Sequence, residues 1–293
     1  MNITIGIPAY NEEKNIGEII KKLKNISKNI IVCDDGSNDN TGSIAKSLGA
    51  IVIKHEKNLG YGKAIKSIFS EARKINSEVL ITFDGDGQHR IEDIPCLLEP
   101  IMNGDAEIVI GSRFLKNETI MPKYRKIGVQ VITKVTNASI NEKLTDSQSG
   151  FRAYSKRILD EIIISENGMG VSTEILIKSN QKNFRIVEVP IIILYNGNTS
   201  THNPVSHGTS VLLSTIKFTS IQHPLKFYGI PSLFFLILGM SFLVWTIQIY
   251  AEETRIVTNI ALVGIASLIL GVILMISAIL LYAIITVIRE TKN

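Results

Sequence analysis

The sequence has few of the residues that mark several common classes of protein. It contains only two cysteines, Cys33 and Cys96, in 293 residues, and they lack the spacing of metal ligands. A disulfide scaffold and a cysteine-based zinc site are therefore excluded, and we interpret both residues as buried free thiols in a reducing compartment. The charges nearly balance, with 31 basic and 27 acidic residues, so no nucleic-acid partner is expected. The first residues form a strand pattern without the basic and apolar segments of a signal peptide.

Long uncharged stretches occur only near the carboxyl terminus. Residues 229–250 contain no charge, and residues 256–288 form a longer stretch of the same kind. About 20 residues are needed to cross the hydrocarbon core as a helix, so each stretch can cross once. The short connector at 251–255 carries two acids, whereas Lys226 and Arg289 flank the outer ends. The positive-inside rule then predicts that both outer flanks, and the domain before them, are cytoplasmic.

The first part of the chain alternates between short apolar runs and helical patterns. Such alternation predicts a parallel sheet with helices on both faces, whose ligands bind at the carboxyl ends of the strands. The predicted strands are 3–7, 30–33, 51–53, 79–83, 108–110 and 187–194. The predicted helices are 13–23, 41–48, 62–74, 93–102, 123–141 and 173–180.

A pair of carboxylates follows the fourth predicted strand, in the segment Asp-Gly-Asp-Gly-Gln at 84–88. Side chains two positions apart on an extended chain share a face, so Asp84 and Asp86 can converge. Two adjacent carboxylates repel each other unless a cation lies between them, and oxygen ligands suit Mg²⁺ or Mn²⁺. A Ca²⁺ loop of the EF-hand type is excluded, because His89 and Pro95 occupy the positions that need Gly and Glu. A solvated acidic turn is the alternative.

Several motifs together resemble those of family 2 glycosyltransferases. They are Pro-Ala-Tyr-Asn-Glu at 8–12, Asp-Asp-Gly-Ser at 34–37, Asn-Leu-Gly-Tyr-Gly-Lys-Ala at 58–64, Asp-Gly-Asp-Gly-Gln-His at 84–89, Gly-Ser-Arg-Phe at 111–114, and Asp146 with Ser-Gly-Phe-Arg at 149–152. The branch that they resemble most includes dolichyl-phosphate mannose synthase and bacterial polyprenyl-phosphate glucosyltransferases. The resemblance covers about residues 1–195 and implies the GT-A fold, a Rossmann-like α/β domain with a mostly parallel sheet, followed by a membrane hairpin.

This resemblance also implies a division of the chain. Residues 1–198 would form a cytoplasmic catalytic domain, and residues 199–228 a polar loop and an interfacial helix. Residues 229–288 would contain two transmembrane helices, at about 229–250 and 258–288, and residues 289–293 a cytoplasmic tail. Both termini would lie on the cytoplasmic side of the membrane.

The same resemblance implies a role for individual residues. The nucleotide-binding residues would be Pro8, Tyr10, Glu12, Asp34, Asp35, Lys63 and Asp84. The divalent metal would be held by Asp84, Asp86 and Gln88. Arg113 and Arg125 would bind the acceptor phosphate, and the catalytic residues would be Asp86, Arg113 and Asp146.

The chemistry of a lipid monophosphate agrees with these roles. Such a phosphate is largely dianionic at neutral pH, so it is a nucleophile that needs cations for positioning rather than a general base. Arginine suits this task because it binds phosphate through two nitrogens. A hydroxyl acceptor would need a base, for which Glu174 is the candidate.

One segment departs from the family pattern. Relatives usually carry a basic residue after the last strand, whereas residues 199–208 contain neither lysine nor arginine. His202 and His207 are candidates for the role of a diphosphate clamp, or else are ordinary loop residues. Because this loop differs, the identity of the sugar does not follow from the resemblance.

We therefore predict a membrane-bound inverting glycosyltransferase that moves a sugar from a UDP- or GDP-sugar to polyprenyl or dolichyl phosphate. A glycosyltransferase with a hydroxyl acceptor and a non-catalytic nucleotide-sugar-binding membrane protein are the alternatives. A processive polysaccharide synthase is disfavoured, because its Gln-x-x-Arg-Trp motif is absent and the single tryptophan, Trp245, lies in a predicted span. Whether the protein forms a homo-oligomer is left open.

Overall fold

A computed structural model describes residues 2–116, 122–140, 142–193, 216, 220, 224–255 and 257–290. The chain divides into two compact units, Met1–Thr215 and Ile216–Asn293.

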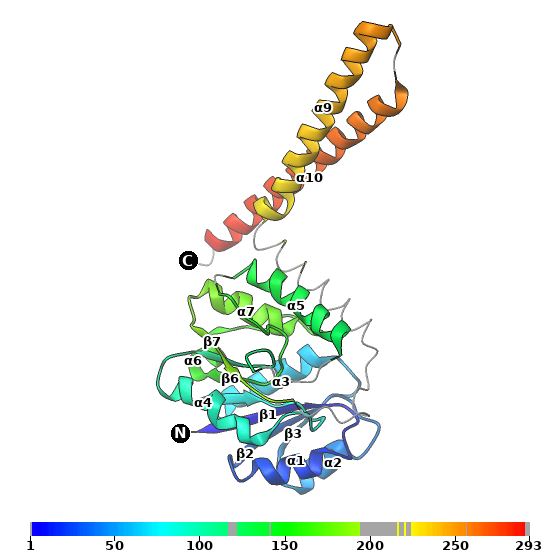
Figure 1. Ribbon diagram of the computed structural model, residues 1–293. Helices are drawn as coiled ribbons and strands as arrows, with labels where there is room; N and C mark the ends of the chain where they lie inside the picture. The colour runs from blue at the N-terminus through cyan, green and yellow to red at the C-terminus, as the bar shows by residue number, and fades with distance from the viewer. Residues whose placement is uncertain are drawn as a thin grey trace. The chain divides into compact units, whose positions relative to one another are not determined.

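The first unit is built on a seven-stranded sheet (Figure 1). The strand order is β3-β2-β1-β4-β6-β5-β7. The strands are β1 (Ile3–Ala9), β2 (Asn29–Asp34), β3 (Ile51–Lys54), β4 (Val79–Thr82), β5 (Ile108–Ser112), β6 (Arg152–Ser155) and β7 (Ile186–Pro190). All neighbouring pairs are parallel except those of β6, which runs antiparallel to both β4 and β5.

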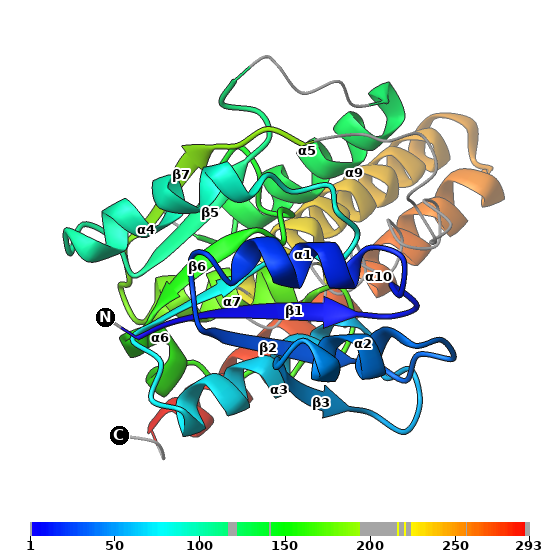
Figure 2. The ribbon, with the colours of Figure 1, turned by 90° about the horizontal axis from the view of Figure 1, so that it is seen from below.

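Helices cover both faces of this sheet (Figure 2). They are α1 (Ile16–Leu23), α2 (Thr41–Ser47), α3 (Tyr61–Lys74), α4 (Ile94–Met102), α5 (Lys123–Asn137), α6 (Lys156–Glu161) and α7 (Val171–Gln181), with a 3₁₀ turn at Ile91–Asp93. The bounds of most elements differ by one to three residues from the prediction.

The core follows from the apolar periodicity of the helices and strands. In α1 the residues Ile16, Ile19, Ile20 and Leu23 are buried, which is the spacing of one helical face. They join alternate residues of β1 in a cluster on one face of the sheet. On the other face, Gly6 lies against Ile68 of α3, and a Cβ at this glycine would collide with that side chain.

The prediction missed two elements, β6 and α6, and it misplaced one cysteine. β6 is a four-residue strand that starts with Arg152, so no apolar run marks it in the sequence. Cys33 is buried as predicted, but the prediction for Cys96 is wrong, because this residue is exposed on α4. The apolar face of α4 is formed by Ile94, Leu97 and Leu98, and Cys96 lies outside it.

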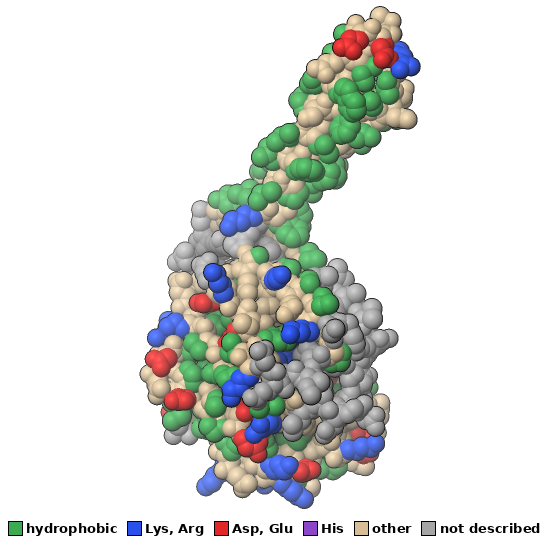
Figure 3. All heavy atoms as spheres, in the orientation of Figure 1, with side chains coloured by type: hydrophobic (Ala, Val, Ile, Leu, Met, Phe, Trp, Pro, Cys, Tyr) green, Lys and Arg blue, Asp and Glu red, His purple; other side chains and the backbone are tan. Residues whose placement is uncertain are grey.

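The second unit is a helical hairpin. A π-helical turn at Leu225–Gly229 leads into α9 (Ile230–Glu253), and α10 (Thr258–Glu290) returns antiparallel to it. Small residues line the contact between the two helices, where the Ser232 hydroxyl donates to the Gly271 carbonyl at 2.8 Å. Hydrophobic side chains cover the outer surface of the hairpin that is in view in Figure 3. Both helices are long and apolar enough to cross a membrane, so the unit is suited to membrane association.

Candidate active site

The site lies where the carboxyl ends of β1, β2 and β4 meet. β1 pairs with β2 on one side and with β4 on the other. The chain therefore adds β2 and β3 on one side of β1 and then crosses to the other side to add β4. Ligands of open α/β sheets bind at such a point. The loops after β1 and β2 are joined, because Asn11 N–H donates to Ser37 Oγ at 3.0 Å and Glu12 N–H donates to Thr41 Oγ1 at 2.8 Å.

The predicted pair, Asp84 and Asp86, lies at this edge. His89 Nε2 lies 2.9 Å from Asp84 Oδ2, and Gln88 N–H donates to Asp86 Oδ1 at 3.0 Å. Burial raises the pKa of Asp86 and the negative charge of Asp84 raises it further. Burial also acts to raise the pKa of Asp84, but His89 and the charge of Arg113 outweigh it and lower that pKa. Because the charge of Asp84 disfavours the ionised form of Asp86, the two neighbouring carboxylates form a site suited to a cation.

A third acid faces the same pair. Burial raises the pKa of Glu12, and the charges of Asp86, Asp39 and Asp84 raise it further, despite a hydrogen bond from Asn15. The main chain is also close here, because a Cβ at Gly85 would lie 3.4 Å from the carbonyl oxygen of Pro8. The structure therefore brings the segments at 8–12 and 84–88 together, as the sequence predicted.

Arg113 and Asp146 are paired, which the sequence did not predict. Arg113 follows β5, and its Nε and one terminal nitrogen donate to the two carboxylate oxygens of Asp146 at 2.6 and 2.8 Å. Burial acts to raise the pKa of Asp146, but the charge and hydrogen bonds of Arg113 outweigh it and lower the pKa. Asp146 is fully buried, whereas the Arg113 side chain is 16% exposed. The carboxylate of Asp146 therefore fixes the orientation of the Arg113 guanidinium after β5.

Asp34 ends β2 and Asp35 follows it, and both carboxylates accept hydrogen bonds from the main chain. Asp34 Oδ1 accepts the N–H of Ser37 at 2.9 Å. The two oxygens of Asp35 accept the N–H groups of Leu59 and Gly60 at 3.0 and 2.9 Å. Both aspartates are at most 4% exposed, so their contacts order the surrounding loops. Their predicted role in nucleotide binding stays a prediction.

Sequence reasoning missed the buried guanidinium of Arg152. It donates to the carbonyls of Ser149, Ser172 and Ser147 at 2.8, 3.1 and 2.6 Å, and it is 1% exposed. It thereby holds the turn after Asp146 against the start of α7. The only signal in the sequence was its place in the motif at 149–152.

Glu174 also has a structural role. This buried carboxylate binds the Ser165 hydroxyl, and it accepts the N–H groups of Ser165 and Glu166 at 2.9 and 2.8 Å. Lys178 Nζ lies 2.6 Å from one of its oxygens. A carboxylate with these partners is poorly suited to act as the base of a hydroxyl acceptor, so its candidacy is not supported.

The remaining predicted residues are only partly described. Pro8, Tyr10 and Lys63 are half-buried, and Gln88 follows Asp86 in the same turn. Arg125 lies in the first turn of α5, but its side chain is outside the described part of the chain, as are His202 and His207. Their predicted roles stay predictions.

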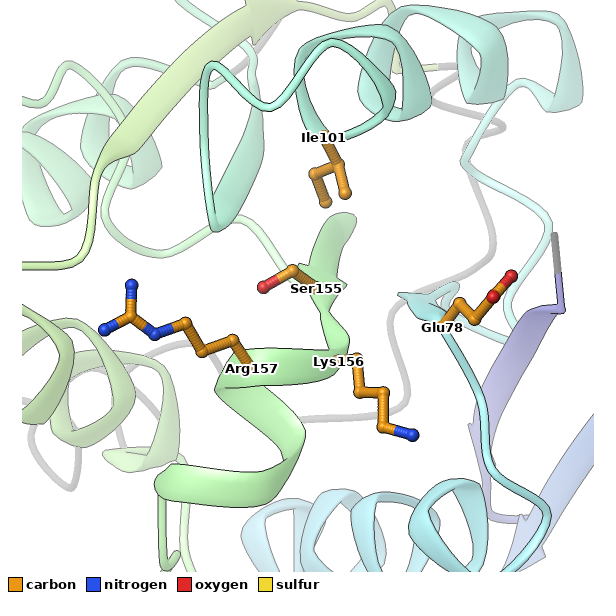
Figure 4. Close-up of a pocket in the computed structure, with 5 residues that line it drawn as sticks. All are labelled: Glu78, Ile101, Ser155, Lys156 and Arg157. Atoms are coloured by element: carbon orange, nitrogen blue, oxygen red, sulfur yellow. The ribbon is translucent and has the colours of Figure 1, made fainter.

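A separate open pocket is lined by Glu78, Ile101, Ser155, Lys156 and Arg157 (Figure 4). Glu78 immediately precedes β4 and Ser155 ends β6, so the pocket lies at the amino end of β4. Asp84 and Asp86 follow the opposite end of that strand. The pocket is therefore distinct from the candidate site.

The fold and these strand tips define a class of α/β proteins that bind their ligands at the carboxyl edge of an open sheet. Residues 4–163 match the model of glycosyl transferase family 2. The match covers more than half of the chain, which therefore belongs to that family of enzymes. The predicted family is confirmed.

Two relatives have names that indicate a reaction. A UDP-N-acetylglucosamine–dolichyl-phosphate N-acetylglucosaminyltransferase of Methanococcus voltae is 35% identical over 71% of this chain and 89% of its own. A dolichyl-phosphate hexose transferase of Haloferax volcanii is 29% identical over 74% of this chain and 93% of its own. The predicted resemblance to the dolichyl-phosphate branch is confirmed by these names.

A solved structure confirms the fold class. Glucosyl-3-phosphoglycerate synthase of Mycobacterium tuberculosis, solved with Mn²⁺, UDP and glucosyl-3-phosphoglycerate, matches with a TM-score of 0.60. The match covers 74% of this chain and 79% of that one at 18% identity. At this identity the likeness shows the fold alone, a mostly parallel sheet covered by helices.

Proposed function

We propose that this protein is a membrane-anchored, metal-dependent inverting glycosyltransferase. It moves a sugar from a UDP- or GDP-sugar to polyprenyl or dolichyl phosphate at the cytoplasmic face. The observation that carries the proposal is the juxtaposition of the Asp84–Asp86 pair with the acids and loops of the neighbouring strand tips. The names of the relatives support the acceptor.

The residues present fit a divalent cation that is shared with the donor. In the described residues no group of three or more His, Cys, Asp or Glu side chains is arranged to hold a metal alone. Asp84, Asp86 and Gln88 would supply oxygen ligands, which suit Mg²⁺ or Mn²⁺, and would leave positions for diphosphate oxygens. When bound, the ion neutralises charge on the leaving diphosphate.

The side chains of this chain then bind and orient the two substrates. Arg113, held by Asp146, would bind the acceptor phosphate and direct one of its oxygens toward the anomeric carbon. That oxygen forms the new bond while the bond to the nucleoside diphosphate breaks, and the electron pair leaves with the diphosphate. Attack from the opposite face inverts the anomeric centre. No proton has to be removed, because the phosphate is already ionised.

The hairpin would tether the catalytic unit to the membrane that holds the lipid tail of the acceptor. The last two residues of α9 are Glu252 and Glu253, and Arg255 follows in the connector to α10, whereas Lys226 and Arg289 lie at the outer ends of the hairpin. The positive-inside rule favours cytoplasmic outer flanks. A topology reporter inserted at Thr254 should therefore report the side opposite to that of the catalytic unit.

Transfer of radiolabelled sugar in membranes tests the reaction. We expect a panel of UDP- and GDP-sugars to label polyprenyl phosphate, with loss of labelling in EDTA and in Asp86→Asn. Asp160→Asn, an exposed aspartate of α6, is the matched control and should label normally. Transfer that survives chelation would remove the metal from the proposal. Binding of nucleotide sugar without transfer from any donor would favour a non-catalytic protein.

A further inference from the structure

The first residue of α3, Tyr61, contacts the acidic site from a different part of the chain. Its hydroxyl lies beside the Asp84 carboxylate, because a Cβ built on Gly150 would lie 2.7 Å from the hydroxyl and 2.9 Å from Asp84 Oδ2. His89 Nε2 lies 2.9 Å from Asp84 Oδ2, so the side chains of Tyr61 and His89 both border this carboxylate.

The backbone around Tyr61 is fixed on one side by a buried polar cluster. The Asp35 carboxylate accepts the N–H groups of Leu59 and Gly60, and it lies 2.6 Å from His55 Nδ1. The other ring nitrogen of His55 lies 2.9 Å from Ser67 Oγ and 3.6 Å from Cys33 Sγ.

This cluster has the composition of a cysteine-hydrolase triad, but it cannot act as one. Cys33 is fully buried, and burial, together with the charges of Asp35 and Asp34, raises the pKa of its thiol to about 12. Only the thiolate is a nucleophile, so Cys33 is inert at neutral pH. The cluster is therefore a structural support for residues 59–60.

On its other side, the start of α3 packs directly on the loop at 166–168. Lys63 N–H donates to the Asn167 carbonyl at 3.1 Å. Gly60 has φ of +97°, and a Cβ there would lie 2.8 Å from the same carbonyl oxygen. At Gly62 a Cβ would lie 2.5 Å from the carbonyl oxygen of Gly168. Tyr61 is thus held between two packed segments and has little freedom to move.

The space for the contact with Asp84 is provided by Gly150. A Cβ at this position would lie 2.7 Å from the Tyr61 hydroxyl and 2.9 Å from Asp84 Oδ2. The three groups therefore converge, and the absence of a side chain at Gly150 allows the hydroxyl to reach the carboxylate.

We propose that Tyr61 is a positioning residue that orients Asp84 for the divalent cation and thereby sets the affinity of the site for metal. The inference rests on the proposed function, because it assumes that Asp84 is a metal ligand. Groups that hydrogen-bond a ligating carboxylate fix its orientation, and their loss typically lowers metal affinity about 10- to 100-fold. Replacement by phenylalanine keeps the ring and removes only the hydroxyl.

Titration of the detergent-solubilised full-length protein with Mn²⁺ tests the inference. Free Mn²⁺ is measured by electron paramagnetic resonance, in the presence of UDP and, separately, of GDP. We expect Tyr61→Phe to bind Mn²⁺ about 10- to 100-fold more weakly than the wild type. The matched control is Tyr250→Phe, which removes an exposed hydroxyl from α9 and should leave the affinity unchanged. In a transfer assay, excess Mn²⁺ should restore the rate of Tyr61→Phe, which a general loss of folding would not permit.

Two outcomes would overturn the inference, and they can be told apart. If the wild type binds Mn²⁺ and Tyr61→Phe binds it equally tightly, Tyr61 does not orient Asp84, and the proposed function stands. If the wild type itself binds no Mn²⁺ with either nucleotide, the proposed metal site fails and the inference fails with it.

Discussion

Arg113 and Asp146 form a two-point ion pair between segments that are 33 residues apart in the chain. The turn that carries Asp146 is itself held by β7, because the Glu188 carboxylate accepts the N–H groups of Thr145 and Asp146, each at 2.7 Å. Three separate parts of the first unit therefore determine where the guanidinium points. If Arg113 binds the acceptor phosphate as proposed, this arrangement would orient its guanidinium before the acceptor binds.

Asp146→Asn should impair the acceptor side of the reaction. The substitution keeps the shape of the side chain but removes the charge that orients Arg113, and breaking a buried pair typically costs about 3–5 kcal/mol. We expect a higher KM for polyprenyl phosphate and a lower kcat, with nucleotide affinity little changed. Steady-state kinetics with varied lipid phosphate measure this. An unchanged acceptor KM would show that the ion pair does not position the acceptor.

Gly150→Ala should disturb the acidic site without unfolding the domain. The new Cβ would lie 2.9 and 3.0 Å from the two oxygens of Asp84, so the carboxylate has to move. Displacement of a reacting group by about 1 Å can lower the rate about 100-fold. Gly128→Ala is the control, because a Cβ at this position of α5 meets nothing within 4 Å. Equal transfer rates for the two variants would contradict the prediction.

Glu174→Gln should lower stability, and the effect should depend on pH. Burial acts to raise the pKa of Glu174, but hydrogen bonds from Lys178, Ser165 and the main chain outweigh it and lower the pKa. A carboxyl group whose pKa is lowered in the folded state stabilises the protein at pH values above the pKa that the group has in the unfolded chain, about 4.3. That stability is lost as the pH falls through the lower folded pKa.

Thermal denaturation of the full-length protein measures this effect. Hydrogen bonds to a charged group contribute about 1.5–3 kcal/mol, which corresponds to a decrease of about 3–12 °C in Tm at pH 7. The difference between Glu174→Gln and wild type should shrink as the pH is lowered below about 4. Glu161→Gln, which alters a partly exposed ion pair with Lys182, should change Tm little. A constant difference at all pH values would rule out the charge of Glu174 as the cause.

Gly239→Leu should force α9 and α10 apart. A Cβ at Gly239 would lie 2.8 Å from the carbonyl oxygen of Gly264 and 2.8 Å from the backbone nitrogen of Leu268, and neither atom can rotate away. Overpacking of this kind typically costs about 1–3 kcal/mol. Trp245 on α9 is the only tryptophan of the chain, so its fluorescence on heating reports the hairpin. Gly229→Ala, where a Cβ meets nothing within 4 Å, should melt like the wild type. If both variants melt alike, the packing at Gly239 does not stabilise the hairpin.

Much of the fold could be predicted because its signals are local. Apolar runs marked β1, β2 and β4, and the acids at 84–86 follow the last of these strands as expected. β6 could not be recognised, because its four residues carry no apolar periodicity and its place between β4 and β5 depends on pairing with distant strands. The exposure of Cys96 likewise depends on how α4 is rotated against the sheet.

The sequence by itself determined the alternation of strands and helices from β1 to β5, the acidic tip of β4 and the apolar length of α9 and α10, because each depends on neighbouring residues. Only the tertiary structure decided the contacts of Asp35 with Gly60, of Tyr61 with Asp84 and of Arg113 with Asp146. These contacts join residues far apart in the chain. They form only when packing of the sheet and helices brings the groups within hydrogen-bond distance, and burial then makes each unpaired polar group costly.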